Sequence, residues 1–100
     1  MKLYIDTSNN QKTIVGLDDD RVEQATGVDK SQQVLVLINQ ILEKNNKTMK
    51  DITEIEVEVG PGSYTGLRVG VAVANGLAWT LKIPVNNEKM VYPKYEVEPK

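Results

Sequence analysis

Residues 60–81 read GPGSYTGLRVGVAVANGLAWTL, a glycine-rich loop followed by a helix-forming stretch with almost no charge. Between Gly66 and Leu81 the only charged residue is Arg68. A helix with one face in water normally carries several charges on that face. We therefore predict that this helix is covered on both sides, and that one of the two covers is a sheet of the same chain.

Small residues recur along this predicted helix at every fourth position, at Gly66, Gly70, Ala74 and Ala78. Rows of small side chains let a neighbouring backbone approach closely. Close packing would compensate for glycine inside a helix, which costs roughly 1 kcal/mol relative to alanine. Two interpretations are open. The helix lies between its own sheet and the first helix, or it packs against another chain, which we favour because a 100-residue chain with two helices is short for covering both sides.

The loop from Gly60 to Gly66 lies between a predicted strand and the start of this helix. Backbone N–H groups at such a junction can bind phosphate. The loop lacks the Gly-Lys-Ser/Thr ending of a Walker A loop, since Leu67 and Arg68 follow it. It also lacks the third glycine of a dinucleotide-binding loop, where it has Thr65. The alternative to anion binding is a tight structural turn with Thr65 as the helix cap.

The segments on either side of this stretch predict a sheet. Residues 55–59 alternate strictly between apolar and charged side chains, as expected of a strand with one buried face. Short runs of strand character, separated by polar turns, occupy residues 2–6, 11–17 and 21–26, and a last short strand begins at residues 83–85.

A first helix is predicted between the third and fourth strands, with Asp29 or Ser31 as its cap. The order βββ-α-β-α-β implies a mixed α/β sheet covered by two main helices, the order of a ribonuclease-H-like, actin-like (ASKHA) half-domain. Residues 1–92 are expected to form this single domain. Residues 93–100 are expected to form a loosely ordered tail, because they combine two prolines with alternating charge.

Composition excludes several kinds of chemistry. The chain has 100 residues, a net charge of −2, no Cys and no His. A basic nucleic-acid footprint is therefore absent, and so are thiolate metal sites and Ser-His-Asp catalysis. No apolar run approaches the ~20 residues that cross a bilayer, and without an apolar leader the chain is expected to be cytoplasmic. We predict no metal site, no cofactor and no catalytic residue.

A second polar turn extends the possible anion site. Asp6, Thr7 and Ser8 end the first predicted strand, where actin-like folds hold phosphate and metal. The competing interpretation is a structural turn, because strand ends often carry such residues. The candidate phosphate-binding set is Asp6, Thr7, Ser8, Gly60, Gly62, Ser63, Thr65 and Gly66.

The run Gly60-Pro61-Gly62-Ser63-Tyr64-Thr65-Gly66-Leu67-Arg68-Val69-Gly70, continuing to Ala78-Trp79, resembles the signature of the TsaB (YeaZ) family, and Ile5-Asp6-Thr7-Ser8 resembles the family's start. The resemblance covers residues 1–92. It implies the N-terminal lobe of an actin-like (ASKHA), M22 glycoprotease-like protein. That protein would be a non-catalytic scaffold for tRNA N6-threonylcarbamoyladenosine (t6A37) modification.

The resemblance also implies partners. These are a TsaD-like catalytic subunit, a TsaE-like ATPase and, in isolation, a second copy of the chain, with tRNA reached only indirectly and no direct membrane contact. In this family the two helices of the lobe pack against those of the partner in a four-helix bundle. The positions carried over are Val34, Leu37, Ile38, Ile41 and Leu42 on the first helix and Leu67, Gly70, Val71, Ala74, Leu77, Ala78 and Leu81 on the second.

The sequence departs from the family in two ways. Family members usually carry a second lobe, and they often have a His near the start of the first helix, where this chain has residues 29–33 and no His. The lack of His argues against catalysis or peptidase activity. The competing function is a nucleotide- or phosphate-binding module that uses the Asp6-Thr7-Ser8 turn and the Gly60–Gly66 loop.

Overall fold

The computed structural model describes residues 1–27 and 29–93. The predicted order is confirmed as far as the second helix. The predicted tail, residues 93–100, lies outside the described residues apart from Pro93. The elements are β1 (Lys2–Asp6), β2 (Lys12–Leu17), β3 (Asp20–Ala25), α1 (Lys30–Lys44), the short 3-10 helix η1 (Met49–Asp51), β4 (Glu54–Val57) and α2 (Tyr64–Leu81).

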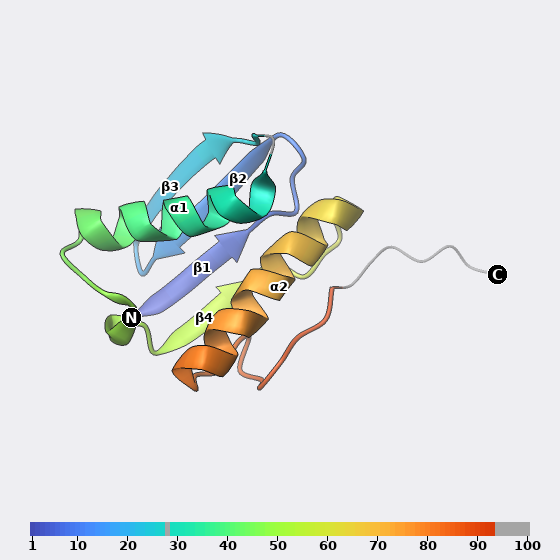
Figure 1. Ribbon diagram of the computed structural model, residues 1–100. Coiled ribbons are helices and arrows are strands. Elements are labelled where there is room, and N and C mark those ends of the chain that lie inside the picture. Colours follow the sequence, from blue (N-terminus) through green and yellow to red (C-terminus); the bar gives the residue numbers. More distant parts are fainter. Residues whose placement is uncertain (28, 94–100) are drawn as a thin grey trace.

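The four strands form one sheet in the order β3-β2-β1-β4. β2 is antiparallel to both β1 and β3, whereas β4 is parallel to β1, so the predicted mixed sheet is confirmed. Both helices lie on the same face of this sheet, with α1 over β2 and α2 over β4 (Figure 1). Among the described helices, none is long and apolar enough to span a membrane.

The last predicted strand is reduced to one parallel bridge, between Ile55 and Val85. The chain reverses directly after it, because Asn86 and Asn87 have φ values of 50° and 65°. Positive φ at both central residues defines the tight turn of a two-residue hairpin, and asparagine adopts it more readily than most residues. Glu88 then exchanges two backbone hydrogen bonds with Val85, of 2.8 and 2.9 Å.

The hydrophobic core lies between the sheet and the helices. Asp29 caps α1 by accepting the backbone N–H of Gln32 (3.1 Å), which selects it over Ser31. The apolar residues of α1 form one arc on the helix surface, and this arc is buried except that Leu35 is 44% exposed at its edge. The core residues of the two main layers are Leu3, Ile5, Val15, Leu17, Ile55 and Val57 from the strands and Val34, Leu37, Ile38, Ile41, Leu42, Val71, Ala74 and Ala78 from the helices.

α2 begins earlier than predicted, and Thr65 is not its cap. The cap is Ser63, whose backbone is not helical (φ −58°, ψ 125°) and whose Oγ accepts the N–H of Gly66 (3.2 Å). The one amide side chain in the helix, Asn75, binds both backbone groups of Val91, at 2.8 and 3.0 Å. This pair of hydrogen bonds holds the segment after the helix along one flank of α2, as Figure 1 shows.

Candidate functional site

The structure brings the two candidate phosphate-binding segments together. The end of β1 packs against the first turn of α2, where the fully buried Thr7 donates its hydroxyl hydrogen to the carbonyl oxygen of Gly66 (2.5 Å). The backbone N–H of Ser63 donates to the carbonyl oxygen of Ser8 (2.8 Å). The turn and the glycine loop therefore form one joined unit, which we call the β1–α2 junction (residues 6–8 and 60–70).

The glycines of the β1–α2 junction are required by close packing. A Cβ atom at Gly66 would lie within 3.0 Å of the carbonyl oxygen of Thr7, and one at Gly70 would lie as close to the Thr7 hydroxyl. At Gly62 a Cβ would lie 2.7 Å from Ser8. The row of small residues on α2 thus lets the helix approach strand β1 of its own chain, which covers this side of the helix. The helix is not enclosed between the sheet and α1, because both helices lie side by side on the same face of the sheet (Figure 1).

Polar side chains at the junction bind one another. Asp6 Oδ1 accepts the backbone N–H (2.9 Å) and the hydroxyl hydrogen (2.6 Å) of Ser8. Lys30 donates from the first turn of α1 to the carbonyl oxygens of Thr7 (3.4 Å) and Asn9 (3.3 Å). Burial lowers the pKa of Lys30, and the negative charge of Asp6 opposes that effect.

Lys30 belongs to this junction, although it is not among the predicted site residues. A lysine in the first turn of a helix faces the positive end of the helix dipole, which is unfavourable. The sequence position of Lys30 was therefore a signal that its charge is stabilised by groups outside the helix. These groups are the carbonyl oxygens of Thr7 and Asn9.

An anion would find several donors of the junction already engaged. The N–H of Gly66 is bonded to Ser63, and that of Ser63 is bonded to Ser8. Gly62 and Thr65 are exposed, and Gly60 adopts a φ of 130°, which favours glycine. Phosphate binding remains a prediction, because packing alone accounts for the glycines at positions 62 and 66. Within residues 1–27 and 29–93, no group of three acidic side chains is placed to hold a metal ion.

On the face of the sheet away from the helices, Tyr4 lies between charged side chains. The guanidinium of Arg21 lies 4.4 Å from the ring centre of Tyr4, and the Tyr4 hydroxyl donates to Asp6 (3.3 Å). Burial, followed by the negative charges of Asp6 and Glu58, raises the pKa of Tyr4 to about 12, against the opposing charge of Arg21.

Most of the predicted interface residues lie in the core of the chain itself. A side chain buried against its own sheet cannot also face a partner, so those positions are not the exposed surface of the helices. Leu77 and Leu81 are half-buried at the border of the core. The buried positions are Val34, Leu37, Ile38, Ile41, Leu42, Leu67, Gly70, Val71, Ala74 and Ala78.

A different part of α2 faces outward. We define the outer strip of α2 as the exposed Ala72, Gly76 and Trp79 together with Val69 and Val73, which are half-buried and also contact the core. Trp79 is 83% exposed, and nothing lies within 4 Å of a Cβ atom built on Gly76. Toward α1 the strip borders a shallow groove that also includes Ser31, Thr65 and Arg68. In the single chain α2 is therefore covered on its inner side and uncharged along much of its outer side.

Comparisons with known proteins identify the family. The family model described as TsaD, tRNA N6-adenosine threonylcarbamoyltransferase, matches residues 24–87. The tRNA threonylcarbamoyladenosine biosynthesis protein TsaB of Bacillus subtilis is 40% identical over 88 residues, which is 84% of this chain and 38% of that protein. This chain belongs to the TsaB (YeaZ) family. TsaB of Escherichia coli is 34% identical over 55 residues, or 55% of this chain and 24% of the relative.

Solved structures show the same fold. YeaZ from Pseudomonas aeruginosa superposes with a TM-score of 0.71 at 24% identity, covering 84% of this chain and 41% of that one. The fold is thus the actin-like (ASKHA) type that the sequence predicted. The chain spans less than half the length of these TsaB and YeaZ relatives.

Proposed function

We propose that this chain takes part in tRNA threonylcarbamoyladenosine modification as a non-catalytic scaffold, and that its partner is a TsaD-like catalytic subunit. Family membership and the names of its TsaB relatives support the role. The observation that carries the scaffold proposal is the outer strip of α2, which has no charged side chain and whose Ala72, Gly76 and Trp79 are exposed in the single chain.

The outer strip has the properties of a helix-packing surface. Gly76 presents bare backbone, which lets a second helix approach closely. Trp79 supplies most of the apolar area, because an aromatic side chain buries on the order of 150 Å² when it is covered. At about 25 cal/mol per Å², burial of that area favours association by about 4 kcal/mol before the entropic cost of binding.

The role is proposed as non-catalytic because the chain lacks Cys and His and because the hydroxyls of Thr7 and Ser8 are already bonded. Thr7 donates to Gly66, and Ser8 donates to Asp6. Binding through the outer strip would orient the catalytic subunit, and tRNA would be contacted only through that subunit. A TsaE-like ATPase is a further proposed partner, in the cytoplasm.

Co-expression with the TsaD of the same organism tests the proposal. We expect one complex in size-exclusion chromatography with light scattering, and restored t6A in a strain depleted of its own TsaB. The variant Trp79→Glu should abolish both results, while Gln40→Glu on the exposed side of α1 should preserve them. A homodimer that persists in the presence of TsaD, with no t6A restored, would contradict the choice of partner.

A further inference from the structure

β4 is an edge strand of the sheet, and within the described residues 1–27 and 29–93 a short stretch around Val85 lies along its outer side. Glu58 donates its N–H inward, to the carbonyl oxygen of Ile5 (2.9 Å). The backbone groups of Ile55 point to the outer side of β4. Its N–H donates to the carbonyl oxygen of Pro84 (2.9 Å), and its carbonyl oxygen accepts the N–H of Asn86 (2.8 Å). The next outward-facing residue is Val57, which a continuing fifth strand would bind through its backbone.

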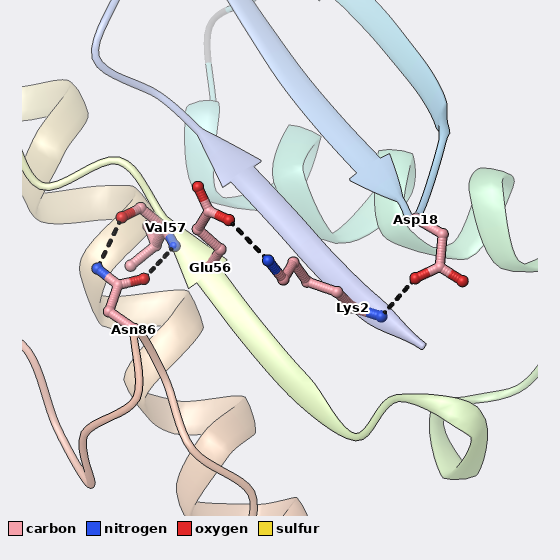
Figure 2. A network of polar contacts seen from close by, with 5 residues as sticks. All are labelled: Lys2, Asp18, Glu56, Val57 and Asn86. Carbon is pink, nitrogen blue, oxygen red and sulfur yellow. Dashed lines mark hydrogen bonds and ion pairs between the residues drawn. The ribbon is translucent and has the colours of Figure 1, made fainter.

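Asn86 binds Val57 with its side chain instead. Its Oδ1 accepts the Val57 N–H (2.8 Å), and its Nδ2 donates to the Val57 carbonyl oxygen (3.0 Å), as Figure 2 shows. A carboxamide offers the same donor and acceptor as a peptide group, so it replaces the backbone of an added strand. The positive φ of Asn86 turns the main chain away from β4 and leaves this position to the side chain.

Acidic side chains line the same edge. Glu54, Glu56 and Glu58 alternate with the buried Ile55 and Val57, so all three lie on the sheet face away from the helices. With Asn86 and Asn87 they border a shallow hollow along the strand.

The cation bordering this hollow is Lys2, and it is already paired. Its Nζ lies 3.2 Å from Oε1 of Glu56, the contact drawn in Figure 2. Residues 84–86 already lie beside Ile55, so the carboxylate left for an added strand at Val57 is that of Glu58. A basic side chain of the added strand would lie close to Glu58, and opposite charges on neighbouring strands stabilise pairing.

We propose that the outer edge of β4 at Val57 is a strand-acceptor site that the Asn86 carboxamide holds closed. The segment that fits it is an extended one with basic residues at alternate positions. Binding exchanges the two side-chain hydrogen bonds of Asn86 for two backbone hydrogen bonds and adds a charge pair with Glu58. The site is independent of the proposed partner surface, because the outer strip of α2 lies on the other face of the sheet.

The variants Asn86→Gly and Asn87→Gly form a matched pair. Both positions have positive φ, which glycine adopts without strain, and each variant removes one carboxamide. The probe is a fluorescent peptide of alternating lysine and valine, with a glutamate and valine peptide of equal length as the charge control. By fluorescence anisotropy we expect Asn86→Gly to bind the lysine peptide at least about tenfold more tightly than the wild type or Asn87→Gly does, since two hydrogen bonds no longer compete.

Three results would overturn the proposal. The first is equal affinity of all three proteins for the lysine peptide, which removes the closure by Asn86. The second is equal affinity of Asn86→Gly for the two peptides, which removes the preference for basic residues. The third applies if circular dichroism shows that Asn86→Gly is unfolded. The wild type is then titrated with the lysine peptide, and an amide NMR signal of Val57 that does not change at millimolar peptide would overturn the proposal.

Discussion

Alanine at Gly66 is expected to destabilise this chain, whereas alanine at Gly76 in the same helix is expected to stabilise it. At Gly66 a new Cβ atom would press on the backbone oxygen of Thr7, which cannot rotate away. The first turn of α2 would have to move off β1, and the Thr7 hydroxyl would lose the carbonyl oxygen it binds. At Gly76 nothing lies within 4 Å of the added atom.

The two changes differ by several kcal/mol in the free energy of unfolding. Overpacking at Gly66 costs about 1–3 kcal/mol, and an unpaired buried hydroxyl costs about 1–3 kcal/mol more. The better helix propensity of alanine offsets about 1 kcal/mol of that loss, so Gly66→Ala should lower the free energy of unfolding by about 3 kcal/mol. Gly76→Ala retains only the propensity term and should raise it by roughly 1 kcal/mol.

Thermal and urea unfolding followed by circular dichroism measure the difference. For a chain of this size 1 kcal/mol corresponds to about 4–8 °C in Tm, so the variants should lie on opposite sides of the wild type. A Gly66→Ala protein as stable as Gly76→Ala would refute the account of the β1–α2 junction, because it would mean that the helix and β1 are not in close contact in solution.

Three further predictions concern other parts of the chain. Trp79→Glu should leave Tm within a few degrees of the wild type while weakening partner binding, since that side chain is 83% exposed. Asp29→Ala should cost about 1 kcal/mol in unfolding experiments, because it removes the cap of α1. Tyr4 should ionise near pH 12 in an ultraviolet titration. Since its folded pKa exceeds the unfolded value of 10.0, its contribution to stability is complete below pH 10 and is lost as pH rises toward 12, a loss that Tyr4→Phe should remove.

Each of these has a result that contradicts it. Cooperative unfolding lost in Trp79→Glu would mean that the tryptophan is part of the core. An unchanged stability of Asp29→Ala, with Ser31→Ala destabilised instead, would move the cap of α1 to Ser31. Ionisation of Tyr4 at the pH of free tyrosine would show that neither burial nor the nearby carboxylates act on it.

Elements with a strong local pattern were predictable from the sequence. The apolar and charged alternation before Gly60 gave β4, and the apolar arc with Asp29 before it gave α1 and one of its two candidate caps. In both cases neighbouring residues carry the information, because one face of the element is buried and the other is not. The start of α2 was misplaced, because serine and threonine two positions apart can each serve as a cap and only the backbone angles distinguish them.

The long-range contacts were not predictable in the same way. The small residues of α2 correctly indicated a close neighbour, but a sequence does not say whether that neighbour belongs to the same chain. It is Thr7, 59 positions before Gly66. Ala74 was predicted to lie at an interface for the same reason, although it is buried within the chain itself. The final strand was lost because Asn86 and Asn87 form a turn, a signal that two adjacent asparagines carry and that the sequence analysis did not use.

The place of β1 in the sheet has a consequence for synthesis on the ribosome. β1 lies between β2, its neighbour in sequence, and β4, which is translated only after the whole of α1. Until then the nascent β-meander exposes the backbone edge of β1 that β4 later covers, along with Leu3 and Ile5. Exposed strand edges of this kind invite misassembly, so the interval before residue 57 leaves the exit tunnel is when a nascent-chain chaperone would protect this protein most.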